Sequence, residues 1–467
     1  MTHLGKRDSS GRTLVVKSRE TPTGFVVIVE DREFPVEFPP EIWAATPADL
    51  RRALLENLVF GNTHFLPLML GQEQIHYDFP LPLLESFLFK NQLFDLTSTE
   101  KADEQESTAY LRPFYNLSFE FERGAGALPD AKDWPQPDRH APTAILPFSF
   151  GKESLATTAL CLEIGIRPVL VYCQEPVQPY EEAYKVEKLR EFGGRFGVET
   201  HFIRNAPGLF RYGKAFGFTP ATEVGWGSQA TLLALLALPF ARAYNAEYIL
   251  FGNEFANNET GFRQGWRTFS SFDQTSYWAQ QQNHMIRILS GGQVQVKSSL
   301  EPLEEISIFN LLHRRYPEIG RYQFSCSAEE PLYADSQWCH ACYKCARMYL
   351  FARCCDIDPN AIGFKKDLLR PELFSHYFGA VYKTGFSFEL DFAFYVLYKR
   401  HVAGSALELF EREKLPHLKP WRDYWEYFTA LKPDMNLPDA HKAKMVSIFS
   451  QELARFREIL PPLRDRP

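Results

Sequence analysis

The sequence predicts an α/β protein whose central domain is a doubly wound parallel sheet. Between residues 144 and 252, short apolar segments alternate with longer segments of helical spacing, which is the pattern of consecutive β-α-β units. The apolar segments lack polar alternation, as expected for strands covered by helices on both faces. A polar, glycine-containing turn follows the first strand, where such sheets bind ligands outside their strand ends.

The central domain is expected to span residues 141–365. Its helices are recognised by apolar spacing and its strands by short runs rich in Val, Ile, Leu and Tyr. The expected elements, in chain order, are strand 144–149, helix 155–163, strand 168–173, helix 181–196, strand 199–203, helix 228–243 and strand 247–252.

Residues 1–140 are expected to form an N-terminal α+β domain. The β-branched runs within 12–38 predict strands, and the apolar spacing within 47–97 predicts helices. The polar, Gly- and Pro-containing stretch 98–140 predicts a linker or long loop.

Residues 366–467 are expected to form a helical C-terminal region. The segment 388–398 is strongly aromatic, and the segment 441–459 has the apolar spacing of an amphipathic helix.

Bulk composition indicates a globular enzyme-sized chain. The 467 residues suggest two or three domains, with 45% hydrophobic and 23% charged residues. The net charge of −7 disfavours nucleic acid as a partner. The N-terminus has no apolar signal core, and the longest apolar run is about 11 residues where a membrane span needs about 20. We therefore expect a cytoplasmic protein with no membrane segment.

The turn Ser149-Phe-Gly-Lys-Glu-Ser154 has the composition of a polyphosphate-binding loop. Gly151 permits close approach of the backbone, Ser149 and Ser154 offer hydroxyl groups, and Lys152 offers a cation at a helix N-terminus. The Walker spacing is absent. The alternative is an ordinary strand-to-helix turn with a capping serine and a solvated lysine.

This loop resembles the Ser-Gly-Gly-x-Asp-Ser loop of the PP-loop ATP pyrophosphatases, with Phe150 in place of a glycine and Glu153 in place of the aspartate. The resemblance implies an adenine nucleotide α-hydrolase-like, Rossmann-like core. It also implies ATP and Mg²⁺ as cofactors and adenylation of a substrate with release of pyrophosphate. Lys152 and Glu153 are then the expected catalytic residues, and residues 149–152 and Ser154 the ATP contacts.

Four cysteines follow in the spacing Cys326-x12-Cys339-x2-Cys342-x2-Cys345. Four thiolates with two short chelating steps suit a closed tetrahedral Zn²⁺ site. The alternatives are an iron–sulfur centre and four unrelated thiols. His340 could replace one cysteine as a ligand, but the favoured interpretation is a solvated residue or one that contacts a ligand without binding the metal.

Together, the loop and the cysteines resemble the 7-cyano-7-deazaguanine synthase branch of that superfamily, over roughly residues 143–365. The resemblance includes the run Ser299-Leu-Glu-Pro-Leu-Glu-Glu-Ile and Asp356-Ile-Asp-Pro359. It implies a small-molecule carboxylate substrate similar to 7-carboxy-7-deazaguanine, converted to an amide or nitrile or joined to an acceptor. The flanking regions suggest a larger acceptor, such as a protein or peptide, and a homodimer is compatible with the sequence.

Three other functions stay open. The layout also resembles the ATP-dependent epimerase of UDP-N-acetylmuramoyl-L-alanyl-L-glutamate, which shares the adenylation step. A tRNA-modifying PP-loop enzyme is a second alternative, and a non-catalytic zinc module that binds a partner is the third.

Two further segments carry candidate substrate residues. Gly252, Asn253, Glu254 and Asn257 follow the fourth strand, so they are expected to contact the nucleotide or substrate. Asp273 begins an amide-rich segment and is a candidate general base. The alternatives are a polar loop with asparagine caps and the solvated face of a helix.

Overall fold

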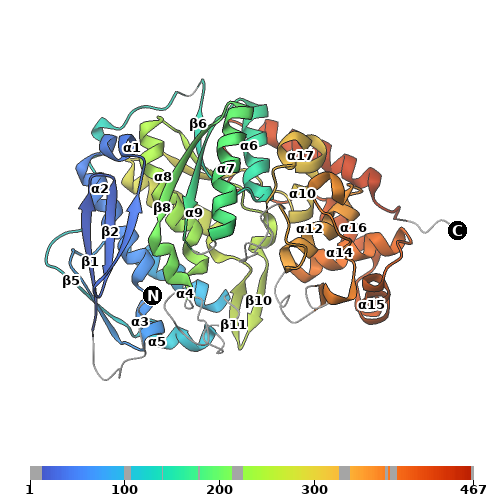
Figure 1. Cartoon of the computed structure of the whole chain (residues 1–467), viewed down its shortest axis with the longest axis horizontal. Coiled ribbons are helices and arrows are strands. Elements are labelled where there is room, and N and C mark those ends of the chain that lie inside the picture. The colour runs from blue at the N-terminus through green and yellow to red at the C-terminus, as the bar shows by residue number, and fades with distance from the viewer. Residues whose placement is uncertain are drawn as a thin grey trace.

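The computed structural model describes residues 13–98, 107–138, 140–176, 179–212, 224–324, 337–373, 377–378 and 386–463. Over these residues the protein is an α/β structure built on a ten-stranded, mostly parallel sheet with many helices. The N-terminal strands and the C-terminal helices lie at opposite ends of the molecule (Figure 1).

Five parallel strands form one half of the sheet, in the spatial order β12-β9-β6-β7-β8. They are β6 (Thr143–Pro147), β7 (Arg167–Gln174), β8 (Glu199–Asn205), β9 (Tyr248–Phe251) and β12 (Gln295–Ser298). The chain steps outward from β6 to β8 and then returns to place β9 on the other side of β6. The strand order therefore reverses between β6 and β9.

Helices cover both faces of these strands (Figure 1). Along β6, Ala144 and Leu146 pack into one apolar cluster and Ile145 into the other, as the two-residue period of a strand requires. The first cluster contains apolar residues of α6 (Lys152–Ile164) and α7 (Pro179–Phe196). The second cluster contains those of α8 (Gln229–Ala243) and α9 (Ser276–Leu289). The predicted alternation of strands and helices is confirmed here.

The N-terminal strands continue the same sheet. They are β1 (Leu14–Thr21), β2 (Gly24–Val29), β3 (Arg32–Glu37), β4 (Gln74–Tyr77) and β5 (Ser118–Phe121). The β3 strand pairs antiparallel with β8 through Val36–Asn205 and Glu37–Arg204. Strands from both sides of residue 140, where a domain boundary is predicted, therefore belong to one continuous sheet.

Strands β4 and β5 lie within ranges where helices and a linker are predicted, so the predictions were wrong at these two short strands. The rest of 47–97 is mainly helical, as predicted. Each is four residues long, and each is held by parallel pairing, β4 to β1 and β5 to β4. Pairing between segments this far apart leaves no periodic signal in so short a run.

The helices of the N-terminal part are α1 (Pro40–Ala45), α2 (Ala48–Thr63), α3 (Leu66–Leu70), α4 (Glu85–Ser98) and α5 (Leu111–Tyr115).

Helices dominate the chain after β12, as predicted for its C-terminal part. They are α10 (Glu305–Arg315), α11 (Pro317–Gly320), α12 (Tyr343–Cys354), α14 (Phe386–Lys399), α15 (Ser405–Glu413), α16 (Trp421–Thr429) and α17 (Lys442–Ile459). Their apolar faces share one cluster with α6. A separate hairpin, β10 (Thr260–Arg263) and β11 (Trp266–Phe269), projects beside α4 (Figure 1). None of the helices described combines the length and apolar character that crossing a bilayer requires.

Candidate nucleotide and metal sites

The 149–154 loop borders a cavity of about 510 Å³ at the carboxyl ends of β6, β7 and β9. This is the point where the strand order reverses, and ligands of open α/β sheets bind at such points. Ser149, Gly151, Lys152, Glu153 and Ser154 all line the cavity. The predicted loop residues, apart from Phe150, are therefore gathered around one opening.

Phe150 takes a backbone conformation that favours glycine, with φ of 60°. Its side chain is fully buried and packs against Phe148 and Phe192, with ring centroids 4.7 and 6.0 Å away. It does not line the cavity. The aromatic ring thus occupies the core side of the loop, and the backbone keeps its glycine-like path toward the cavity.

Serine hydroxyls satisfy the polar groups of this loop. The Gly151 N–H donates to Ser149 Oγ at 3.3 Å, and the Ser149 N–H donates to Ser154 Oγ at 3.3 Å. The Ser154 hydroxyl in turn donates to the Gly151 carbonyl at 3.1 Å. Because α6 begins at Lys152, its N-terminus faces the same opening, and its partial positive charge favours an anion there.

Lys152 is the centre of a buried charge cluster. Its side chain is 4% exposed, and its Nζ lies 2.6 Å from Glu305 and 3.5 Å from Glu254 and also pairs with Glu153. Arg347 pairs with Glu305 as well. Three carboxylates thus surround one ammonium group at the cavity wall.

The carboxylates of this cluster differ in their titration. Burial raises the pKa of Glu254, although Lys152 opposes this shift. Burial also acts to raise the pKa of Glu153, but the neighbouring Lys152 and Arg347 outweigh it, and the pKa is lowered. Of these two carboxylates, Glu153 is therefore better suited than Glu254 to stay ionised beside a ligand.

The remaining cavity wall combines cations, aromatic rings and amides. Such a lining suits a ligand that carries both anionic groups and a flat ring. The residues concerned are Lys185, Lys344 and Arg347, the rings of Tyr172, Tyr212, Trp226 and Phe324, and the polar side chains of Glu175, Gln229 and Gln274.

In the loop after β9, some residues line the cavity and others are buried behind the cavity wall. Gly252 and Asn253 line the cavity, and Glu254 reaches Lys152. Asn257 is buried behind them, where its Nδ2 donates to Gln274 Oε1 at 3.5 Å. Three of the four predicted residues therefore lie at the cavity or its charge cluster, and Asn257 lies one contact away.

Gly252→Ala is expected to destabilise the protein by about 1–3 kcal/mol, as overpacking does. A Cβ there would lie 2.7 Å from Thr157 Oγ1 and 2.9 Å from the Glu153 carbonyl oxygen. Urea denaturation measures the effect. Gly194→Ala on the exposed face of α7 is the matched control, because nothing lies within 4 Å of its added Cβ. An unchanged midpoint for Gly252→Ala would contradict the close packing of β9 against α6.

Asp273 lies outside the cavity lining. Its Oδ2 accepts a hydrogen bond of 2.7 Å from the Ala230 N–H in the first turn of α8. Burial raises the pKa of Asp273 to about 7, the Ala230 hydrogen bond opposes the shift, and Asp95 adds to it. The geometry makes it a cap for α8, and its role as a general base stays a prediction.

Asp273→Asn is expected to stabilise the protein most at alkaline pH. The folded state favours the protonated carboxyl, so the wild-type chain loses stability as pH rises from the ordinary pKa of 3.8 through about 7. Asparagine keeps an acceptor oxygen and removes this loss, on the order of 2–4 kcal/mol at pH 8 and less at pH 5. Urea denaturation at both pH values measures the difference. Loss of turnover in the same variant would support the general-base role.

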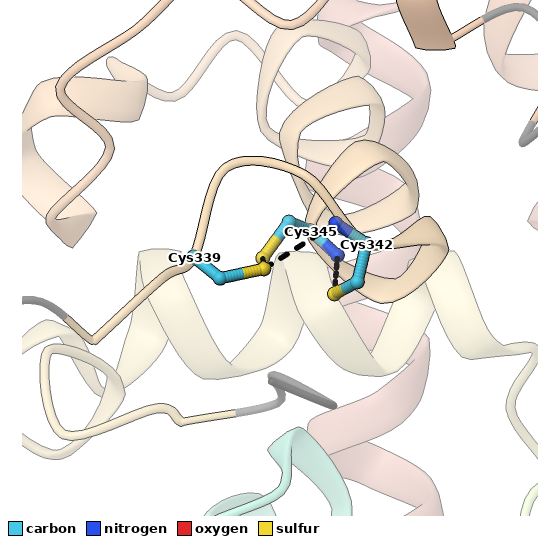
Figure 2. Close-up of side chains that lie close together, drawn as sticks. All are labelled: Cys339, Cys342 and Cys345. Carbon is cyan, nitrogen blue, oxygen red and sulfur yellow. Dashed lines mark hydrogen bonds between the residues drawn. The ribbon is translucent and has the colours of Figure 1, made fainter. Parts of the chain in front are cut away.

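Three of the four predicted metal ligands come together before and within the first turn of α12 (Figure 2). The Sγ atoms of Cys339, Cys342 and Cys345 lie within 4.8 Å of one another, and those of Cys339 and Cys345 are 3.7 Å apart. Backbone N–H groups donate to the sulfurs, from Cys342 to Cys339 at 3.3 Å and from Cys345 to Cys342 at 3.4 Å. Such donors stabilise thiolates, so this group can hold a metal ion and is compatible with zinc.

Cys326 lies outside the described residues. His340, the other candidate ligand, is buried, and its Nε2 accepts a hydrogen bond of 2.9 Å from the Lys365 N–H. That nitrogen is therefore engaged with the backbone.

Glu305 and Arg347 were not predicted as site residues, although both had a usable signal. Glu305 follows β12 by a short loop at the carboxyl edge of the sheet, and Arg347 follows Cys345 by two residues.

Protein-family models were compared with the chain and none matches, and a comparison with curated proteins also found no match.

Proposed function

We propose that this protein is an ATP pyrophosphatase that activates a carboxylate as its adenylate. In this proposal the five parallel strands are a doubly wound, Rossmann-like nucleotide-binding fold, which the order β12-β9-β6-β7-β8 and the two covered faces support. The observation that carries the proposal is the position of Lys152. It lies at the N-terminus of α6, in the cavity where the strand order reverses.

The loop residues would hold the pyrophosphate part of ATP. The Gly151 N–H and the hydroxyls of Ser149 and Ser154 can exchange their present internal bonds for phosphate oxygens. Lys152 would neutralise charge on the leaving pyrophosphate while an oxygen of the substrate carboxylate attacks the α-phosphorus. The products are the acyl adenylate and pyrophosphate.

The carboxylates around Lys152 fit a divalent cation. One oxygen from each of Glu153, Glu254 and Glu305 lies within 4.8 Å of the others, and Mg²⁺ prefers such oxygen ligands. When bound, Mg²⁺ would neutralise phosphate charge. A cation there would compete with Lys152 for the carboxylates and so free its ammonium group for the phosphates.

The far wall of the cavity would receive the substrate. Trp226 and Tyr212 present ring faces or edges, and Gln229 and Gln274 present amides. These groups suit a flat heterocyclic carboxylate similar to 7-carboxy-7-deazaguanine. The acceptor of the activated carboxylate would be ammonia or a larger amine.

The cysteine site would be structural and would shape the same cavity. Cys345 lies in the first turn of α12, and Tyr343, Lys344, Arg347 and Met348 of this helix line the cavity. A zinc ion fixing that turn would therefore hold Arg347 beside Glu305.

The direct test is incubation of the protein with ATP, Mg²⁺ and 7-carboxy-7-deazaguanine. Without an amine, we expect exchange of labelled pyrophosphate into ATP. When ammonia is added as the acceptor of the acyl group, we expect release of AMP and pyrophosphate in equal amounts. Release of ADP and phosphate would contradict adenylation. Pyrophosphate only with UDP-N-acetylmuramoyl-L-alanyl-L-glutamate would favour the epimerase, and absence of any ATP-dependent rise in melting temperature would favour the non-catalytic zinc module.

A further inference from the structure

The segment between β12 and α10 is attached to the C-terminal helices by several buried contacts. The Ser298 N–H donates to the Asn436 carbonyl at 2.9 Å, and the Lys432 N–H donates to the Pro302 carbonyl at 2.9 Å. Asn436 also donates two hydrogen bonds to the Glu301 carboxylate, from its backbone N–H at 2.6 Å and from its Nδ2 at 2.8 Å. Residues 298–302 are thus held from the C-terminal side by both backbone and side-chain groups.

Two consecutive glutamates at the start of α10 bind cations from different parts of the chain. Glu305 binds Lys152, as described above, and Glu304 lies 3.1 Å from Lys432 Nζ. The Lys432 side chain is 8% exposed and that of Glu304 is 2% exposed. Lys432 Nζ also donates to the carbonyl of Tyr427 at 2.8 Å and lies 3.1 Å from the centroid of its ring. Because the Lys432–Glu304 pair is buried, loss of the Lys432 cation leaves the Glu304 carboxylate without its ion-pair partner, next to Glu305.

Glu389 on α14 completes the attachment. The N-cap residue of α10, Glu304, forms no capping bond with its own side chain. The Glu389 carboxylate accepts the Ile306 N–H at 2.5 Å instead, and it is 3% exposed. It therefore satisfies a first-turn N–H that the helix cannot satisfy internally.

We propose that Lys432 and Glu389 are positioning residues of the nucleotide site, which set Glu305 against Lys152 through the first turn of α10. This inference rests on the proposed ATP site. It makes the C-terminal helical region, which lies outside the range of the resemblance, contribute to the geometry of that site. Neither residue lines the cavity, so their effect on ATP passes through Glu304 and the backbone of Ile306.

The test compares Lys432→Met with Lys432→Arg. Without the cation, the buried Glu304 carboxylate loses its ion-pair partner, so the first turn of α10 no longer holds Glu305 in place beside Lys152. We expect the KM for ATP to rise about tenfold in Lys432→Met, while kcat stays within about twofold because Lys152 itself is intact. Lys432→Arg restores most of the affinity. Lys442→Met, which removes a more exposed ion pair with Asp434 in the same region, leaves both constants unchanged.

A second pair of variants guards against failure to fold. Glu389→Gln keeps an acceptor for the Ile306 N–H and should retain the parent KM, whereas Glu389→Leu orphans that N–H and should raise the KM. The unaltered protein gives a third readout, since ATP should slow amide hydrogen exchange in residues 298–306 and 427–436.

Variants that melt earlier but keep the parent KM would overturn the proposal, and so would unchanged exchange in both segments on ATP binding. If the unaltered protein binds no ATP at all, the proposed function itself fails, which is a different result from ATP binding that is insensitive to Lys432 and Glu389.

Discussion

Lys152→Met is expected to reduce ATP-dependent pyrophosphate release by roughly 100-fold or more, the size expected when a charge that stabilises a transition state is removed. Methionine keeps much of the buried volume of the side chain but removes the ammonium group that lies within 4 Å of Glu153, Glu254 and Glu305. The leaving pyrophosphate then faces carboxylates without the ammonium group. Initial rates with saturating ATP measure the loss.

Lys188→Met is the matched control, because Lys188 forms a 2.7 Å ion pair with Glu191 on α7 but lies outside the cavity lining. Far-ultraviolet circular dichroism should show both variants folded. A Lys152→Met protein that turns over ATP at the parental rate would place the phosphate site elsewhere.

In the proposed zinc-bound protein, Cys345→Ser is expected to lose the metal ion and to lower the melting temperature by roughly 10 °C or more, because metal-binding free energy contributes directly to folding. Cys345 is fully buried, and its Sγ is 3.7 Å from that of Cys339. The first turn of α12 would loosen, and Arg347 would lose its fixed place beside Glu305. Elemental analysis and thermal unfolding measure the two effects.

Two further variants sharpen this test. Cys161→Ala should keep its zinc, since Cys161 is buried in α6 away from the cysteine group. Cys326→Ser should behave as Cys345→Ser does if Cys326 is the fourth ligand. Retention of zinc by Cys345→Ser would contradict the proposed metal site. The absorption spectrum of an iron–sulfur cluster in the unaltered protein would show that the cysteines bind a cluster in place of zinc.

The central alternation of strands and helices could be predicted because each element carries its own signal. Strands covered on both faces need apolar residues at nearly every position, and β7 and β9 have them. The helices α7 and α17 are long enough for their apolar spacing to be unambiguous.

The extent of the sheet could not be predicted, because it depends on pairing between distant segments. Four residues suffice for β4 once β1 lies beside it, but four residues alone have no distinguishing period. The same limit applies to the site. The sequence marks Lys152 by its loop, but nothing local shows that Glu305 meets it or that Arg347 pairs with Glu305. These contacts arise only when α10 packs against α6 and α12 packs against α10.

Phe150 shows how a departure from a motif can be judged only in three dimensions. In sequence, it places a large side chain where the resembling loops have glycine. In the structure, burial against Phe148 and Phe192 offsets the cost of a positive φ, so the substitution leaves the cavity open.

The junction between β3 and β8 has a consequence for synthesis on the ribosome. The β1–β3 strands emerge long before β8, so β3 waits with one edge unpaired while the rest of the chain is made. Such an edge is a template for pairing with other nascent chains. In β3, Pro35 removes one backbone donor, and Arg32, Glu33 and Glu37 place charges along the strand. The β3 strand, whose edge stays unpaired until β8 has been made, therefore carries residues that disfavour pairing with other chains.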